Sequence, residues 1–194
     1  MKLKHTMALA AMMVLTLASS ALAQEAQPTA TAAMAKPEKY KDWDLFCPKP
    51  PAANAPQVCE IRTVILSDKG QRLGALVVAA QVGGGGKDVI ASALLPLGVD
   101  LTQQPSLSVG SSKIELKYLR CLQRGCEAIT ALSADQQAAL RGGSSAKVTV
   151  GVGPGKSATF DFSLAGFSAA HDALRKKVGA AKEKRSEVIG QGLL

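Results

Sequence analysis

Aromatic side chains are scarce in this chain of 194 residues, where one Trp, two Tyr and four Phe make up 4% of the sequence. Proteins that hold single-stranded nucleic acid use aromatic rings as platforms on which the bases stack. So few rings make nucleic acid a poor candidate partner, although the formal net charge is +8.

Histidine is scarcer still, with only His5 and His171. His5 lies in an N-terminal export segment described below, so a Ser-His-Asp site would depend on His171 alone. No G-x-S-x-G motif accompanies it, and we interpret His171 as a solvent-facing residue on a helix. Carboxylates are scattered, and no spacing pairs two of them for cutting a sugar bond: Asp42, Asp44, Asp100, Glu115, Glu127, Asp135 and Asp161.

The chain also lacks a complete phosphate-binding loop and the ligand spacing of a metal site. Gly155-Lys156-Ser157 has Val150 where that loop needs its first glycine, and Asp88 follows Gly83–Lys87 where the loop needs Ser or Thr. We interpret both segments as ordinary loops. We therefore expect no cofactor, no metal and no catalytic activity. The alternative is a periplasmic enzyme or enzyme inhibitor whose carboxylates converge only in the fold.

No apolar run after residue 23 is long enough to span a bilayer, which takes about 20 residues. Residues 1–23 themselves combine Lys2 and Lys4, the apolar run Met7–Leu17 and the cleavage pattern Ala21-Leu22-Ala23. This is the pattern of a secretory signal peptide. We predict cleavage after Ala23, no transmembrane span in the mature chain, and a protein that is periplasmic or secreted, with outer-membrane association left open.

The composition divides the remaining chain into three parts. Residues 24–39 are rich in Ala, Pro, Thr and Gln, and we predict a flexible leader. Residues 40–175 form the predicted folded domain, and residues 176–194 form a basic tail. A positively charged tail can contact an anionic envelope surface, although a solvated terminus has the same composition. The candidate contact residues are Lys176, Lys177, Lys182, Lys184 and Arg185.

The folded part shows the period-two alternation of strands. Lys113–Tyr118 is the clearest case, and the predicted strands also include residues 42–47, 57–67, 73–82, 89–95, 148–152 and 160–164. Two short helices interrupt them. Ser133 and Gln136 match a capping box, with Gly142 as a left-handed stop, and a second helix starts near Ser168. Many short strands with few helices indicate an antiparallel sandwich or barrel.

The four cysteines are an even number in a chain predicted to be exported, which favours disulfides over zinc or a redox pair. Four cysteines allow three pairings, and the count alone does not choose among them. Cys121 and Cys126 flank a predicted four-residue hairpin loop, where opposed residues lie within disulfide reach. Cys47 and Cys59 bracket a proline-rich loop between two strands. Proximity therefore favours the pairs Cys47–Cys59 and Cys121–Cys126.

Five landmarks occur in an order and spacing that resemble the invasion-associated locus B family of alphaproteobacterial envelopes. They are WDLFC at 43–47, Cys59 with its strand, LPLGV at 95–99 followed by Leu101, CLQRGC at 121–126, and LAGF at 164–167. The resemblance covers about residues 40–175 and implies an exported β-sandwich linked to the bacterial surface and, in some pathogenic members, to host-cell entry. It brings no catalytic residues.

Together these observations predict a mainly β protein, an antiparallel, immunoglobulin-like β-sandwich with two short helices. The predicted function is a non-enzymatic binding module of the envelope or cell surface. Its expected partner is an anionic envelope surface or another protein.

Overall fold

The computed structural model describes residues 36–50, 55, 57–81 and 88–191, with residues 183–191 as backbone only. Within them the elements in chain order are β1 (Glu38–Tyr40), β2 (Trp43–Phe46), β3 (Val58–Leu66), β4 (Arg72–Gln81), β5 (Val89–Leu95), β6 (Ser106–Val109), β7 (Ser112–Glu115), β8 (Lys117–Leu122), β9 (Gly125–Ala131), α1 (Ala134–Gly142), β10 (Ser145–Gly153), β11 (Lys156–Ser163) and α2 (Phe167–Gln191).

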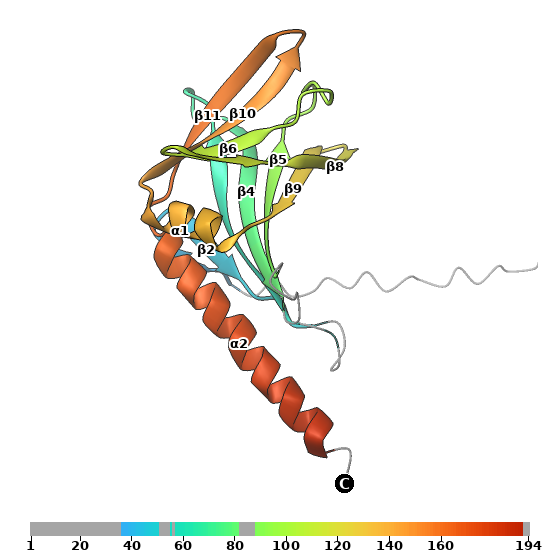
Figure 1. The fold of residues 1–194 in the computed structure, drawn as a ribbon, viewed down its shortest axis with the longest axis vertical. Coiled ribbons are helices and arrows are strands. Elements are labelled where there is room, and N and C mark those ends of the chain that lie inside the picture. The colour runs from blue at the N-terminus through green and yellow to red at the C-terminus, as the bar shows by residue number, and fades with distance from the viewer. Residues whose placement is uncertain (1–35, 51–54, 56, 82–87, 192–194) are drawn as a thin grey trace, which may run out of the picture. The chain divides into compact units, whose positions relative to one another are not determined.

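These strands form two antiparallel sheets (Figure 1). One has seven strands in the order β1-β2-β3-β4-β5-β9-β8, and the other has four in the order β11-β10-β6-β7. The predicted antiparallel β-sandwich is confirmed. Its likeness to immunoglobulin domains is limited to the two layers, because most neighbouring strands here are also neighbours in sequence, whereas immunoglobulin sheets follow a Greek-key order. β6 was not among the predicted strands, and the predicted strand Lys113–Tyr118 is divided at Leu116 between β7 and β8, which belong to different sheets.

The core lies on one face of the seven-stranded sheet, called here the inner face. β5 shows the pattern clearly, since Val89, Ala91, Ala93 and Leu95 are buried and alternate with more exposed residues. Alternate strand residues point to opposite faces of a sheet, so this period of two separates core from surface. The second layer over the inner face consists of the four-stranded sheet, whose β11 contacts β3, and of α2, which contacts β1 to β4.

Helix α2 packs on the core through an apolar stripe. Phe167, Ala170, Leu174 and Val178 are buried at helical spacing. The helix is 25 residues long, so it is not the short helix that was predicted. The predicted boundary between residues 175 and 176 lies inside it, because the stripe continues past that point to Val178. Figure 1 shows its C-terminal part extending away from the sheets.

Helix α1 begins as predicted and ends differently. The Ser133 side chain accepts from the Gln136 backbone N–H, and the Gln136 side chain accepts from the Ser133 backbone N–H. The left-handed stop at Gly142 is wrong, since Gly142 is still helical and the C-cap is Gly143 in an extended conformation. A Cβ on Gly143 would lie 2.5 Å from Val109 Cγ1 and 2.8 Å from Leu164 Cδ1. Close packing therefore requires this glycine.

Two local predictions need correction. The predicted flexible leader ends at residue 39, but its last two residues are ordered. Glu38 and Lys39 belong to β1 and pair with Leu45 and Asp44 of β2. In the predicted strand 148–152 a period of two places Val152 on the face of Val148 and Val150, yet Val152 is exposed. The register between β10 and β11 shifts between Gly151 and Gly153, and such a bulge turns the following side chains to the other face.

Candidate binding surface

The face of the seven-stranded sheet opposite the core, called here the outer face, carries a row of apolar residues. Val64 of β3 pairs with Ala75 of β4, and Ala75 pairs in turn with Leu94 of β5. Residues directly opposite each other in a sheet point to the same face. The buried stripe of α2 packs on the inner face, and β11 lies beside β3 across a pocket that Val64 and Leu66 help to line.

Large aliphatic side chains on this face are exposed at the end of the sheet that holds the β8–β9 turn. The exposed fractions are 36% for Val64, 51% for Leu66, 37% for Leu94 and 62% for Leu122. We call these four residues the outer leucine surface. Gly125 is the cross-strand partner of Leu122. A Cβ built on Gly125 would lie 3.4 Å from a methyl group of Leu94, so Leu94 lies close to the β8–β9 hairpin.

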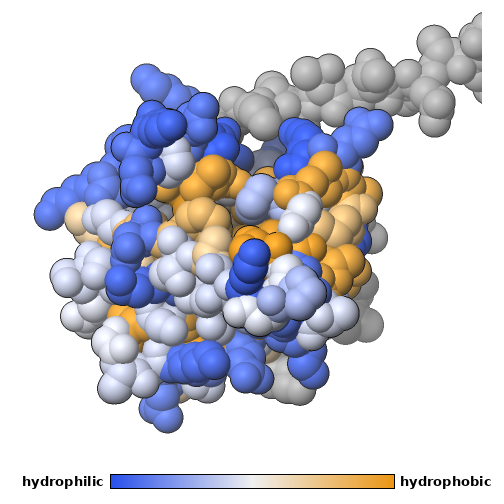
Figure 2. Space-filling view, turned by 90° about the horizontal axis from the view of Figure 1, so that it is seen from above, coloured by the Kyte–Doolittle hydropathy of each residue, from blue (hydrophilic) through white to orange (hydrophobic). Residues whose placement is uncertain are grey.

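Basic side chains accompany the outer leucine surface. Arg72 is the cross-strand partner of Leu66, and Arg124 lies in the turn beside Leu122. Arg120 lies two residues before Leu122 in β8 and forms an ion pair with Glu127 at 3.0 Å. Figure 2, which views the molecule from above, shows apolar side chains gathered on one side with strongly hydrophilic ones between them. Clustered apolar groups among cations mark an interaction surface more often than scattered exposed residues do.

Disulfides tie down two of the hairpins. Cys121 and Cys126 are bonded as cross-strand partners with their Cα atoms 3.9 Å apart, and Cys47 is bonded to Cys59 with a Cα separation of 4.3 Å. These are the two pairs that proximity favoured. The β8–β9 loop is shorter than predicted, because Leu122 pairs with Gly125 and leaves a turn of Gln123 and Arg124. Gly125 has φ +138°, a conformation that glycine adopts without strain.

The predicted anionic-contact residues lie on α2 rather than on a separate tail. Lys176 is exposed, and Lys177 donates to Glu38 of β1 at 2.5 Å. This contact lowers the pKa of Glu38 and raises that of Lys177. Lys182 also has an interaction of its own. The side chains of Lys184 and Arg185 lie outside the described part of the chain. Of the five residues, the structure therefore places the side chains of Lys176, Lys177 and Lys182.

Three of the scattered carboxylates line one pocket of about 680 Å³ between β3 and β11. They are Asp42, Asp44 and Asp161. The lining also includes Arg62 and Arg72, together with Val64 and Leu66 of the outer leucine surface, so the carboxylates adjoin that surface. Asp44 pairs with Lys39 and Asp161 with Lys147, each at 3.1 Å. The other carboxylates lie elsewhere. Asp100, for example, accepts hydrogen bonds from Thr102 and Gln103, which lower its pKa.

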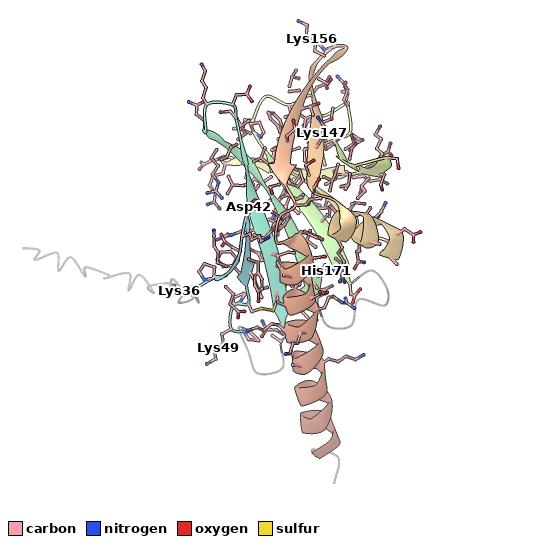
Figure 3. All side chains as sticks on the ribbon, turned by 90° about the vertical axis from the view of Figure 1, so that its left-hand side faces the viewer. Lys36, Asp42, Lys49, Lys147, Lys156 and His171 are labelled. Atoms are coloured by element: carbon pink, nitrogen blue, oxygen red, sulfur yellow. A yellow bond between two sulfur atoms is a disulfide. The ribbon has the colours of Figure 1, made fainter. Side chains whose placement is uncertain are left out.

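The remaining sequence motifs have structural positions. Pro154 and Gly155 form the turn between β10 and β11, and Lys156 begins β11 at the tip seen in Figure 3. Gly83–Lys87 lies outside the described residues. No three His, Cys, Asp or Glu side chains among the described residues are placed to hold a metal ion. The helices that the structure describes include none with the length and hydrophobicity to cross a membrane.

The prediction for His171 is wrong, since its side chain is only 3% exposed. His171 lies on the buried side of α2, four residues after Phe167 and three before Leu174. Its ring stacks on Phe167 with centroids 5.7 Å apart. The sequence carried a signal for this, because positions 167, 170, 171, 174 and 178 make one helical stripe, and a histidine in such a stripe faces the core.

The fold and surface define a class of protein: an antiparallel β-sandwich with two hairpins closed by disulfides, a helix completing one layer, and an exposed apolar patch among cations. Comparison with known families places it further. The model of the invasion associated locus B (IalB) proteins matches residues 43–175, and the chain belongs to this family. The family is not one of known enzymes.

A solved structure supports the same fold. The crystal structure of invasion associated protein B from Bartonella henselae aligns with a TM-score of 0.61 and 23% sequence identity. The alignment covers 73% of this chain and 96% of that one. No curated protein sequence matches the chain significantly. At 23% identity, the similarity between the two structures shows that they share a fold.

Proposed function

We propose that this protein is an exported, non-enzymatic binding module of the bacterial envelope, and that it docks on an anionic lipid surface through the outer leucine surface. The observation that carries the proposal is the exposure of Leu66, Leu94 and Leu122 at one end of the outer face, with Arg72 and Arg124 beside them. Large apolar groups exposed together on a rigid sheet call for a partner.

The signal-peptide pattern of residues 1–23 supports export, and membership of the invasion associated locus B family agrees with an envelope location. The paired disulfides agree with an oxidising compartment. Fractionation of the native bacterium tests this part. We expect the protein in the periplasmic or outer-membrane fraction with Gln24 as its first residue, and a cytoplasmic protein starting at Met1 would contradict export.

The chemistry of the surface favours lipid. Aliphatic side chains inserted at the boundary of headgroups and acyl chains gain about 25 cal/mol per Å² of buried apolar area. Each arginine near an anionic surface adds about 1 kcal/mol, and this part is screened by salt. The two contributions together give reversible, salt-sensitive attachment.

Co-sedimentation with vesicles tests the proposal. We expect binding to vesicles rich in phosphatidylglycerol, weaker binding to phosphatidylcholine vesicles, and loss of most binding in a Leu94→Ser/Leu122→Ser variant. Val58→Ser is the matched control, because Val58 is 40% exposed on the same face of β3 at the opposite end of that strand. Wild-type protein that binds isolated outer membranes but not vesicles of their extracted lipids would point to a protein partner and overturn the lipid assignment.

The basic residues of α2 are the second candidate contact. A truncation after Arg175 would remove Val178 from the core, so charge variants are the sharper test. Lys176→Gln leaves the Lys177–Glu38 ion pair in place. A lower affinity for anionic vesicles in Lys176→Gln, with unchanged stability, would extend the docking surface to α2.

The enzyme alternative has one observation in its favour, the meeting of Asp42, Asp44 and Asp161 around one pocket. The ion pairs to Lys39 and Lys147 weaken it, because they occupy two of the three carboxylates. A screen against glycoside and peptide substrates, with Asp42→Asn as the control, tests it. Turnover that Asp42→Asn abolishes would replace the binding-module proposal.

A further inference from the structure

The buried His171, labelled in Figure 3, borders a pocket of about 530 Å³ between α1 and α2 that shares no lining residue with the carboxylate pocket. Gln137, Ala138 and Arg141 of α1 line it, together with Asp88, which precedes β5, and Arg175 of α2. Pockets of this size hold small organic molecules.

Both ring nitrogens of His171 are buried and have no hydrogen-bond partner among the described residues. A neutral imidazole carries one N–H donor and one acceptor nitrogen. Buried polar atoms without partners are rare and each costs about 1–3 kcal/mol, so an unsatisfied pair calls for an explanation. A ligand in the adjoining pocket, which His171 lines, would supply the missing partner for the N–H.

The hydrogen-bond donors around the ring favour an anion. Arg141 pairs with Asp172 at 3.0 Å and Arg175 with Asp88 at 2.5 Å. A guanidinium has five N–H donors, so each arginine keeps donors for a further acceptor. Burial lowers the pKa of His171, and Arg141 and Arg175 lower it further, while Asp172 acts in the opposite direction. Two arginines thus stand beside two carboxylates, and the N–H donors that the ion pairs leave free are the groups that an anion would use.

We propose that this pocket binds a small organic anion, a carboxylate or a phosphate, whose oxygens accept hydrogen bonds from Arg141, Arg175 and the His171 imidazole. Charge-assisted bonds of this kind are about twice as strong as neutral ones, and arginine suits both oxyanions. The two alanines in the lining, Ala134 and Ala138, leave room for a short carbon chain.

The site is independent of the outer leucine surface, since its residues come from α1, α2 and the segment before β5. Bound anion would also favour the protonated ring, because a negative charge beside an imidazole raises its pKa. Ligand binding and proton uptake at His171 are therefore coupled. The charged groups that act on this equilibrium are Asp88, Arg141, Asp172 and Arg175.

NMR of the histidine side chain tests the site in the full chain, with His5→Asn in every sample so that His171 gives the single imidazole signal. The probes are succinate and inorganic phosphate, with uncharged succinamide as the matched control. We expect saturable shifts of the His171 signal and a higher His171 pKa with at least one of the two anions, and no change with succinamide.

Variants separate the site from general salt effects. Arg175→Gln should lower the affinity for the anion about tenfold, which is the loss expected for one charge-assisted hydrogen bond. Lys147→Gln, which removes an exposed, ion-paired cation on β10, should leave the affinity unchanged. Shifts that do not saturate, that occur equally with succinamide, or that survive Arg175→Gln at full affinity would overturn the proposal. A response to phosphate alone, or to succinate alone, would identify which oxyanion the site takes.

Discussion

Trp43 of β2 and Phe167 at the start of α2 meet edge to face, with ring centroids 4.9 Å apart and planes at 77°. Both are fully buried, although they are far apart in sequence. The Trp43 indole N–H donates to the Ser163 backbone carbonyl, so the same residue also ties β2 to the end of β11. This contact joins the seven-stranded sheet, the four-stranded sheet and the long helix.

Phe167→Ala should therefore lower the free energy of unfolding by about 3–5 kcal/mol, the usual cost of removing a buried aromatic ring. Urea unfolding followed by Trp43 fluorescence measures it, because Trp43 is the sole tryptophan. Phe160→Ala is the control, since Phe160 is half-buried and its loss should cost clearly less. Equal effects of the two substitutions would contradict this role for the Trp43–Phe167 contact.

The two disulfides should stabilise the protein unequally. Loop-closure entropy gives about 2 kcal/mol for the Cys121–Cys126 ring and about 3 kcal/mol for the longer Cys47–Cys59 ring. Replacing each pair by alanine and comparing unfolding in urea without reductant measures both. A larger loss from the Cys121/Cys126 variant would show that the hairpin disulfide acts on native packing rather than on the unfolded chain.

Gly166 should tolerate no side chain. Its φ is +91°, and a Cβ there would lie 1.9 Å from the Tyr40 backbone carbonyl oxygen. Gly166→Ala should thus be strongly destabilising, through both the clash and the left-handed conformation. Gly142→Ala is the matched comparison, because Gly142 ends α1 with nothing within 4 Å of its Cβ position. We expect Gly142→Ala to be neutral or to add up to about 1 kcal/mol of stability.

Stability should fall as the pH drops through the range in which histidine titrates. Burial, with Arg141 and Arg175, lowers the pKa of His171 in the folded state below its ordinary 6.5. The unfolded chain then binds more protons than the folded one, so stability is complete above about pH 6.5 and decreases as the pH falls toward the lower folded-state pKa. Glu38, whose pKa is lowered by Lys177, acts only in a more acidic range.

Urea unfolding at pH 5.5 and 7.5 checks this, with His171→Gln for comparison. The variant should lose most of the difference between the two pH values even if it is less stable at both. An equal pH dependence in wild type and variant would assign the effect to other groups.

Local pattern carried much of the fold. The period-two alternation predicted β5 to the residue, and the capping box predicted the first helical residue of α1, because both signals depend on neighbours a few positions away. The cysteine pairs could be favoured for the same reason, since each pair brackets one loop. The four exposed residues of the outer leucine surface could not be found in this way. They come from three separate strands, and only the register between the strands places them together.

The sequence by itself determined the β-rich architecture, the hairpins that hold the cysteines and the start of α1, since short-range periodicity and turn chemistry encode them. The tertiary structure alone decided which glycines meet a neighbouring backbone, which carboxylates share a pocket and that His171 is buried beside two arginines. Those features depend on contacts between segments far apart in the chain, and their geometry follows from packing the helices and the two sheets around one core.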